Sequence, residues 1–265
     1  RDFFSPNFCI FTKNKFQQIL IDSFLDYISL EKKYSPNTIF AYKNDLISFR
    51  DFCATEYQLE NLAEVEYPII RSWIVSLVDL KISNRSINRK ISSLNSFYKF
   101  LQKTHQVEIN PLTKHKALKS VNKLQVPFTS KEINTAINNI SEKNDFTTIR
   151  NILIVELLYS TGIRKTELIN IKENDIDFYN KTIKILGKRN KERFVPLLES
   201  VTIIVKQYQE LKNEYSKIDN HLLITEKGNK VSKSLVYGII NLYFGKVSTK
   251  VKKSPHILRH SFATH

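Results

Sequence analysis

A break in the apolar periodicity near the middle of the chain constrains its fold more than any other feature. Apolar residues recur at helical spacing in several segments before His105 and in several after Gln125. Between these two residues the pattern decays, and Asn110-Pro111 interrupts it. A chain of 265 residues has room for two ordinary domains. We therefore expect two separately packed domains joined by a linker.

Four helices are predicted in the first half of the chain. Their apolar stripes begin at Phe16, after Ser35-Pro36, at Pro68 and after Ser83. Serine before a helix and proline at its first position are common start signals. On the last of these helices the apolar stripe leaves a basic side opposite it. These segments predict a compact four-helix domain.

A second domain is predicted to begin with a clear helix start. Thr129 and Glu132 form a capping box, and Phe128 with Ile133 forms a hydrophobic staple. The pattern that follows predicts a mainly α fold with a small antiparallel β-sheet. The helices are expected at about 145–160, 164–171, 199–212 and 232–244, and the strands at 182–186 and 192–196. The predicted divisions of the chain are an extension at 1–15, a four-helix domain at 16–108, a basic linker at 109–126 with room for a short helix, and the second domain at 127–265.

The charge balance calls for a polyanionic partner. The formal net charge is +15, and its distribution is uneven. Residues 1–80 carry 8 Lys/Arg against 11 Asp/Glu, whereas residues 81–131 carry 11 Lys/Arg and one acid, Glu108. A positive stripe confined to the middle of the chain suits contact with a nucleic-acid backbone. The alternative is a lysine-rich proteome in which this side is simply solvated.

Other compositional features bound the class of protein. Only 5 glycines are present, which leaves little for a glycine-rich cofactor loop. The two cysteines, Cys9 and Cys53, make neither a disulfide framework nor a metal site. No apolar run approaches the length of a membrane span, and no signal-peptide pattern opens the chain, so we expect the cytoplasm. Because the sequence contains no methionine, we expect it to be a fragment or a trimmed form.

Three cationic clusters indicate a phosphate site. Arg164 follows Thr161-Gly162-Ile163 at a helix entrance, where free backbone N–H groups also favour anions. Lys188 stands at the tip of the predicted hairpin. His256 and Arg259 share one side of a helix that Ser254 is expected to cap. Together these residues could bind a phosphodiester, balance charge in the transition state and protonate a leaving oxygen, with no metal or cofactor.

These clusters lie within stretches that resemble the tyrosine recombinases of the phage-integrase family, and within them the bacterial Xer-type enzymes. The resemblance implies a SAM-like core-binding domain and a catalytic domain that form a C-shaped clamp on DNA. The matching stretches are Leu158–Leu168, Gly187–Pro196 and Pro255–His265 in the second domain, with Tyr34–Thr38 and Asn84–Lys90 in the first.

The resemblance also implies residue roles. Arg164 and Arg259 would grip the scissile phosphate, Lys188 would protonate the 5′-hydroxyl leaving group, and His256 would assist proton transfer. A tyrosine would attack to give a 3′-phosphotyrosyl link, and strands would be exchanged through a Holliday junction. The implied partners are a dif-like double-stranded DNA site, further recombinase subunits in a tetrameric synapse and a DNA translocase. The implied role is chromosome-dimer resolution during cell division.

The chain departs from the family pattern at its end. Nothing follows His265, and none of the 12 tyrosines, Tyr237 and Tyr243 included, stands where the motif puts the nucleophile. We therefore expect the chain to be truncated before that tyrosine, to bind DNA and to be unable to cleave it.

Further residues are expected to contact DNA or to support the site. Glu167 is expected to be the buried partner of Arg164, with a general base as the alternative. His260 is expected to pack against the domain core. The predicted DNA contacts are Lys43, Arg85, Arg89 and Lys90 in the first domain and Arg189 and Lys191 in the hairpin. For Arg189, Lys191 and Arg193, the alternatives are a contact with the DNA backbone and a solvated charge.

Several alternatives stay open. His256, His260 and His265 could be imagined as a zinc site, but no glutamate or cysteine accompanies them. Ser261 lacks the context of a hydrolase nucleophile. At the level of function, the alternatives are a mobile-element integrase and a non-catalytic DNA-binding regulator derived from a recombinase.

Overall fold

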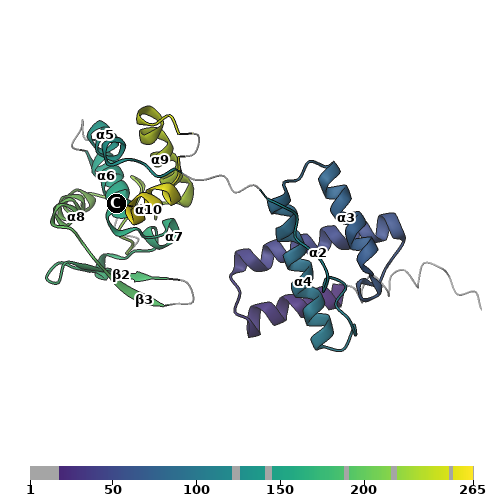
Figure 1. The fold of residues 1–265 in the computed structure, drawn as a ribbon. Coiled ribbons are helices and arrows are strands. Elements are labelled where there is room, and N and C mark those ends of the chain that lie inside the picture. The colour runs from purple at the N-terminus through teal and green to yellow at the C-terminus, as the bar shows by residue number, and fades with distance from the viewer. Residues whose placement is uncertain are drawn as a thin grey trace, which may run out of the picture. The chain divides into compact units, whose positions relative to one another are not determined.

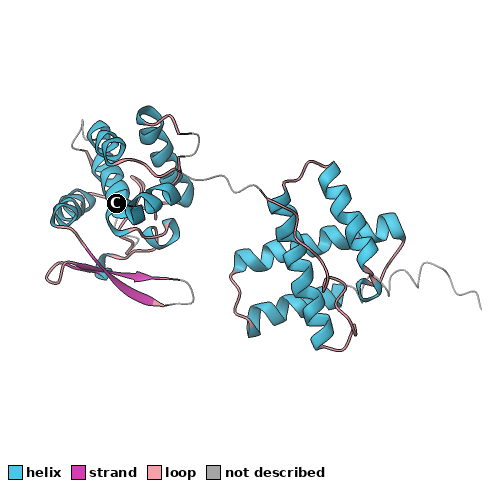
Figure 2. Ribbon diagram, viewed as in Figure 1, coloured by secondary structure: helices cyan, strands magenta, loops and turns pink. Residues whose placement is uncertain are grey.

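The chain folds into two units, each with an apolar core of its own (Figure 1). The computed structural model describes residues 18–120, 126–140, 145–187, 191–215, 220–250 and 253–264. The first unit comprises Arg1–Asn122 and the second Lys123–His265. Figure 2 shows helices in both units and strands in the second, so the expected mainly α fold with a small antiparallel sheet is confirmed.

The first unit contains the four expected helices. Residues 18–26 are helical and continue into a π-helical turn, η1 (Tyr27–Glu31). They are followed by α2 (Pro36–Tyr57), the short 3₁₀ turn η2 (Leu62–Glu64), α3 (Tyr67–Asp79) and α4 (Asn84–Lys103). The predicted caps are present, because the Ser35 and Ser83 hydroxyls each accept a backbone N–H three residues on, both at 3.3 Å.

Aromatic side chains fill the core of the first unit. Phe24 meets Phe97 edge-on at 5.5 Å between ring centroids, and Phe49 lies 4.9 Å from Trp73. The buried hydroxyl of Tyr98 donates to the Leu62 carbonyl at 3.0 Å. The apolar stripe of α4 is turned into this core, as the periodicity predicted. The opposite side of α4, which carries several basic residues, is therefore left in solvent.

The segment predicted to be a linker packs against α4. Leu112 is buried with the core of the first unit. The Asn88 amide exchanges two hydrogen bonds with the backbone of Leu118, at 2.8 and 2.9 Å, and Asn84 donates to the Lys119 carbonyl at 2.8 Å. Residues 111–120 form turns and irregular backbone, so the short helix expected in this segment is absent from its described part. The asparagine contacts replace the backbone bonds that a helix would make.

The second unit is built around α6. The hydrophobic staple and capping box start α5 (Ser130–Ile140), since Phe128 and Ile133 are buried together and Thr129 N donates to Glu132 at 2.8 Å. The Asp145 side chain caps α6 (Phe146–Thr161), which packs against α5, α8 (Glu199–Lys212) and α10 (Pro255–Thr264). The remaining helices are α7 (Lys165–Leu168), the 3₁₀ turn η3 (Glu173–Asp175) and α9 (Lys233–Val247).

The sheet of the second unit has three antiparallel strands in the order β1-β2-β3. The predicted strands β2 (Thr182–Leu186) and β3 (Glu192–Pro196) are present. A third strand, β1 (Ile176–Asp177), was not predicted because two residues carry no periodic signal. In the register of β2 and β3, Ile183 lies opposite Val195 and Ile185 opposite Arg193. The Arg193 side chain therefore shares the inner side of the sheet with buried isoleucines.

Two local expectations are wrong. The helix expected over 164–171 ends at Leu168, because Ile171 and Glu173 leave it to pair with the backbone of residues 220–222. The Ser254 hydroxyl does not cap α10, since it is buried and has no hydrogen-bond partner among the described residues. Its carbonyl instead accepts the N–H of Ile257 at 2.9 Å. In the described part of the chain, no helix has both the length and the apolar character needed to cross a membrane.

Candidate active site and DNA-binding surface

Arg164 is held at the start of α7 by a carboxylate. Gly162 ends α6 in the left-handed conformation, at φ 58°, and the chain then turns into Arg164, the N-cap of α7. The Arg164 backbone N–H donates to Oε2 of Glu167, and its Nη1 donates to Oε1, both at 2.8 Å. The expected pairing of Arg164 with Glu167 is therefore present. The Arg164 side chain stays 52% exposed, which leaves donors free for a ligand.

Glu167 also holds the β-hairpin. Arg193 on β3 donates to its carboxylate from Nη1 at 3.2 Å and from Nη2 at 2.7 Å. Burial by itself would raise the pKa of Glu167, but the hydrogen bonds from Arg193 and Arg164 outweigh it and lower that pKa to about 2. A carboxylate that is charged and already shared by two arginines is a poor general base. Arg193 is therefore not a merely solvated charge, since it pairs with a buried acid, and its contact with the DNA backbone stays a prediction.

Gly187, which follows β2, lies beside this ion-pair cluster. A Cβ added at Gly187 would lie 3.2 Å from Nη1 of Arg193 and 3.7 Å from Oε1 of Glu167. The Gly187 N–H donates to the Lys191 carbonyl at 2.8 Å and closes the turn, while the Lys191 side chain is exposed. Lys188 and Arg189, the predicted general acid and a predicted DNA contact, lie outside the described residues.

Helix α10 presents His256 and Arg259 on the side opposite its buried residues. Ile257, Leu258 and Ser261 are buried, and the Ser261 hydroxyl accepts the Phe128 N–H at 2.8 Å. At about 100° per residue, His256 and Arg259 lie on the other side of the helix. His256 is exposed and Arg259 is partly buried. The sequence prediction that these two residues share a helix side therefore matches the helix geometry.

Phe262 fixes α10 against the turn that leads to Arg164. A Cβ at Gly162 would lie 2.3 Å from Cδ1 of Phe262, so the ring occupies the space that any other residue would need. This close approach requires glycine. The contact fixes the position of α10, which carries Arg259, relative to the turn that carries Arg164.

Arg259 is the third cation of this cluster, and one of its nitrogens lacks a hydrogen-bond acceptor among the described residues. Burial lowers the pKa of Arg259, and the positive charges of Arg164 and Arg193 lower it further, whereas Glu167 acts in the opposite direction. Its Nη1 is buried and has no hydrogen-bond partner among the described residues. Arg164 and Arg193 thus hydrogen-bond to the Glu167 carboxylate. Arg259 adds a third positive charge, close enough to interact electrostatically with all three groups. Such an arrangement favours an anion that brings both charge and acceptor oxygens.

His260 does not take the place predicted for it. Its side chain is exposed rather than packed against the core. Relative to the buried centre of α10, formed by Ile257, Leu258 and Ser261, His260 lies about 100° round the helix. The resemblance suggested a core position for His260, but the helix is rotated so that Ser261 occupies it.

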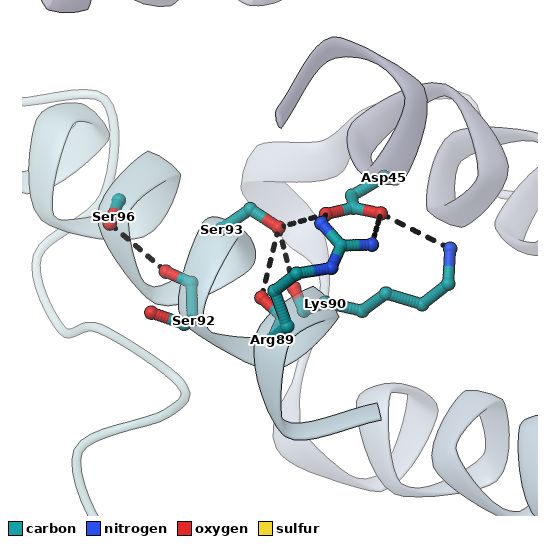
Figure 3. A network of polar contacts seen from close by, with 6 residues as sticks. All are labelled: Asp45, Arg89, Lys90, Ser92, Ser93 and Ser96. Carbon is teal, nitrogen blue, oxygen red and sulfur yellow. Dashed lines mark hydrogen bonds and ion pairs between the residues drawn. The ribbon is translucent and has the colours of Figure 1, made fainter. Parts of the chain in front are cut away.

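In the first unit, two of the residues predicted to contact DNA form ion pairs with one buried carboxylate (Figure 3). Asp45 on α2 receives Arg89 through Nη1 at 2.5 Å and Nη2 at 2.9 Å, and Lys90 through Nζ at 3.2 Å. The Ser93 hydroxyl lies 2.8 Å from Oδ2 of the same carboxylate. The structure therefore brings Arg89 and Lys90 together.

Arg85 and Lys43 stand apart from this network. Arg85 is exposed one turn before Arg89 on the same side of α4. Lys43 is exposed on α2 two residues before Asp45, which places it on nearly the opposite side of that helix.

Sequence reasoning missed Arg193 and Asp45 as partners of site residues, although each left a signal. Arg193 occupies an inward position in the alternation of its strand, opposite Ile185. Asp45 lies beside Leu46 on the apolar side of α2, where an acid needs a cation. In the part of the chain that the structure describes, no group of three or more His, Cys, Asp or Glu could hold a metal ion.

Two family models match the chain. The model described as "Phage integrase family" matches residues 127–265, and "Phage integrase, N-terminal SAM-like domain" matches residues 21–105. Among curated proteins, the chain is 36% identical to Tyrosine recombinase XerC of Oceanobacillus iheyensis, with 94% of this chain and 82% of that protein covered. It is 35% identical to Tyrosine recombinase XerC of Listeria monocytogenes, with 92% and 83% covered.

Solved structures share the fold. The Tn1549 transposon integrase in complex with circular intermediate DNA aligns with a TM-score of 0.72 at 17% identity, over 92% of this chain and 85% of that one. The XerH site-specific recombinase bound to a palindromic difH substrate aligns with a TM-score of 0.70 at 19% identity, over 94% and 84%. At these identities the likeness concerns the fold alone.

Proposed function

Because this chain belongs to the phage integrase family of tyrosine recombinases, we propose that its second unit grips a scissile DNA phosphate with Arg164 and Arg259. The chain is a Xer-like site-specific recombinase, an enzyme of DNA strand exchange. The partners that we propose are double-stranded DNA and further recombinase subunits in a tetrameric synapse. The proposal concerns which residues carry the reaction and on which DNA.

The buried, unpartnered Nη1 of Arg259 carries this proposal. A guanidinium donor without an acceptor is costly inside a protein, and the repulsion from Arg164 and Arg193 adds to that cost. A phosphodiester would supply the missing acceptor and one negative charge. Its transition state carries more charge than the ground state, so the same donors would bind the transition state more tightly.

The remaining roles follow the family motif. A tyrosine attacks the phosphorus, the bond to the 5′-oxygen breaks, and a 3′-phosphotyrosyl link forms. Lys188 would give its proton to the leaving oxygen, and exposed His256 would assist proton transfer. We assign the nucleophile to neither Tyr237, whose ring lies under the Lys165 ammonium, nor Tyr243, whose hydroxyl lies 3.3 Å from the Asn151 amide.

Duplex contacts would come from both units. Lys43, Arg85 and Arg89 would contact DNA from the first unit, and Arg189 with Lys191 from the hairpin. Lys90, also predicted as a contact, is 17% exposed and bound to Asp45, and its role would be to support Arg89. In our proposal the four-helix domain at 16–108 and the catalytic domain at 127–265 each contact the duplex. Phosphate contacts of this kind position DNA and make binding dependent on salt.

A dif-like site is the DNA that we propose. The curated relatives at 34–36% identity are Xer proteins, and a solved structure with the same fold holds a difH substrate. Resolution of chromosome dimers at cell division, with a DNA translocase as an accessory partner, would be the corresponding role. Integration of a mobile element is the competing one.

A covalent-trapping experiment tests the proposal. The natural protein that carries this chain is incubated with nicked duplexes of its own chromosomal dif-like sequence and of a shuffled sequence. We expect a protein–DNA adduct on the first duplex and its loss in Arg164→Ala and Arg259→Ala. An adduct that survives both substitutions would refute the assigned grip. Equal adduct on both duplexes would refute the dif-like target.

A further inference from the structure

The Asp45 network joins two cations of different exposure to one buried acid (Figure 3). The Asp45 side chain is 2% exposed, Lys90 is 17% exposed and Arg89 is 49% exposed. The Lys90 ammonium also lies 5.8 Å above the Trp73 ring, so it is held by α2 and α3 together. Lys90 is therefore largely buried, whereas Arg89 is held by Asp45 and remains accessible to solvent.

The way in which Arg89 binds Asp45 leaves a usable edge of its guanidinium. Both terminal nitrogens donate to the carboxylate, which uses two of the five N–H groups. The Nε–H and the second N–H of Nη2 lie on the adjacent edge and form another two-donor fork. A fork of this kind matches two oxygens of one phosphate.

We propose that Asp45 is the positioning residue that presents Arg89 to the DNA phosphate backbone. The inference rests on the proposed use of Arg89 in DNA binding and adds a residue that never touches DNA. A free arginine side chain loses rotamer freedom when it binds, and that loss weakens the complex. Here the buried carboxylate has ordered the side chain beforehand.

Ser93 fixes the carboxylate in turn. Its hydroxyl lies 2.8 Å from both Oδ2 of Asp45 and the Lys90 carbonyl, so the acid is oriented from α4 itself. The network uses one negative charge against two positive ones and stays cationic. Asp45 thus orders Arg89 without cancelling the attraction of this side of α4 for DNA.

For Asp45→Asn, the proposal predicts a change in DNA affinity opposite in sign to the one that net charge alone predicts. Asp45→Asn removes a negative charge near the DNA-facing side, and charge alone would tighten binding. If Asp45 acts by ordering Arg89, the variant instead binds a mixed-sequence DNA duplex roughly three- to tenfold more weakly. The matched control is Glu31→Gln. It removes an exposed acid of η1 that lies 3.4 Å from Lys103, a residue of the same helix α4 that carries Arg89. The control is expected to bind as well as the unchanged chain or slightly better.

A double-mutant cycle separates positioning from general stability. Arg89→Ala should weaken binding and reduce the slope of log K against log salt by about one phosphate contact. Asp45→Asn made in the Arg89→Ala background should cause no further weakening, because the group that it positions is gone. Independent, multiplying losses would overturn the proposal, and so would an Asp45→Asn variant that binds as tightly as the unchanged chain.

Folding is followed in the same samples. Trp73, the one tryptophan of the chain, lies in the core beside Lys90, so its fluorescence reports urea unfolding of the first unit. Should Asp45→Asn unfold, Arg89→Lys keeps the charge but loses the second fork, and it is expected to bind roughly three- to tenfold more weakly. Wild-type affinity in Arg89→Lys would overturn the proposal. If the unchanged chain fails to bind DNA, the proposed function itself is wrong, and the two failures are thereby distinguished.

Discussion

Arg193 on β3 donates from both terminal nitrogens to the buried Glu167 carboxylate, at 3.2 and 2.7 Å, and so joins the hairpin to the helix start that carries Arg164. The carboxylate itself is 4% exposed. One buried charge thereby sets the relative positions of two segments that sequence motifs place far apart. The second unit depends on this junction for the geometry of its cationic cluster.

Replacement of Arg193 tests the strength of the junction. Arg193→Met removes two charge-assisted hydrogen bonds and leaves Glu167 with Arg164 alone. We expect the free energy of unfolding to fall by about 1.5–3 kcal/mol. The measurement is urea unfolding followed by far-UV circular dichroism. The matched control is Lys181→Met, whose ion pair with Glu199 is more than half exposed and should contribute much less. Equal losses in the two variants would contradict the importance given to the buried pair.

The loss of unfolding free energy at acid pH should depend on Glu167. Its pKa of about 2 in the folded chain lies below the ordinary value of 4.5, so the unfolded chain takes up the proton first as pH falls. The stabilisation from the charged form is complete above pH 4.5 and is lost as pH falls towards 2. Glu167→Gln should therefore flatten the dependence of unfolding free energy on pH in this window.

Urea titrations at several pH values measure that dependence. Glu210→Gln, an exposed substitution on α8, serves as the control and should keep the wild-type profile. A Glu167→Gln profile as steep as that of the control would show that this carboxylate is not the group that titrates.

Two glycines should respond in opposite directions to alanine. At Gly162 the backbone has φ 58° and the new Cβ would overlap the Phe262 ring, so Gly162→Ala should cost more than about 1 kcal/mol. At Gly238, inside α9, a Cβ meets no atom within 4 Å among the described residues, and Gly238→Ala should stabilise by about 0.5–1 kcal/mol. The shift in thermal midpoint of each variant checks the sign. Destabilisation of equal size at both sites would contradict the contact between α10 and the Arg164 turn.

Salt dependence should distinguish an exposed cation from a buried one on α4. Arg85→Gln removes an exposed charge and should reduce the slope of log K against log salt by about one. Lys90→Met removes a side chain that is 17% exposed and bound to Asp45, and it should leave the slope nearly unchanged. Fluorescence anisotropy at several salt concentrations gives both slopes. A larger change for Lys90→Met than for Arg85→Gln would contradict the roles assigned from burial.

Much of the fold follows from local signals in the sequence. The bounds of α8, β2 and β3 match the predicted ranges, because each has a regular apolar pattern between turn residues. The short strand β1 and the early end of α7 depend on pairing between distant backbone segments, which leaves no periodic trace. Tertiary contacts therefore determine the structure at the two places where the local sequence pattern gave the wrong prediction.

The candidate site shows the same division. The motif residues Arg164, His256 and Arg259 could be named because their spacing survives in sequence. Glu167 could also be named, as the partner of Arg164. Arg193 and Asp45 could not, since Glu167 pairs with Arg193 through the strand register and Asp45 pairs with Arg89 through the packing of α2 on α4. His260 was misplaced because a motif resemblance does not give the rotation of the helix about its own axis, which decides the residue that faces the core.

The most direct test of the phosphate grip is the cleavage rate of the natural protein on two substrates. One duplex carries an ordinary scissile phosphate, and the other carries a methylphosphonate there, which lacks the negative charge. If Arg259 neutralises that charge, Arg259→Ala should lose about 10²–10³-fold in rate on the phosphate and much less on the methylphosphonate. Glu210→Gln, an exposed change on α8, should behave as the unchanged protein on both. An Arg259→Ala variant that is equally slow on the two substrates, or as fast as the unchanged protein on the phosphate, would contradict the account.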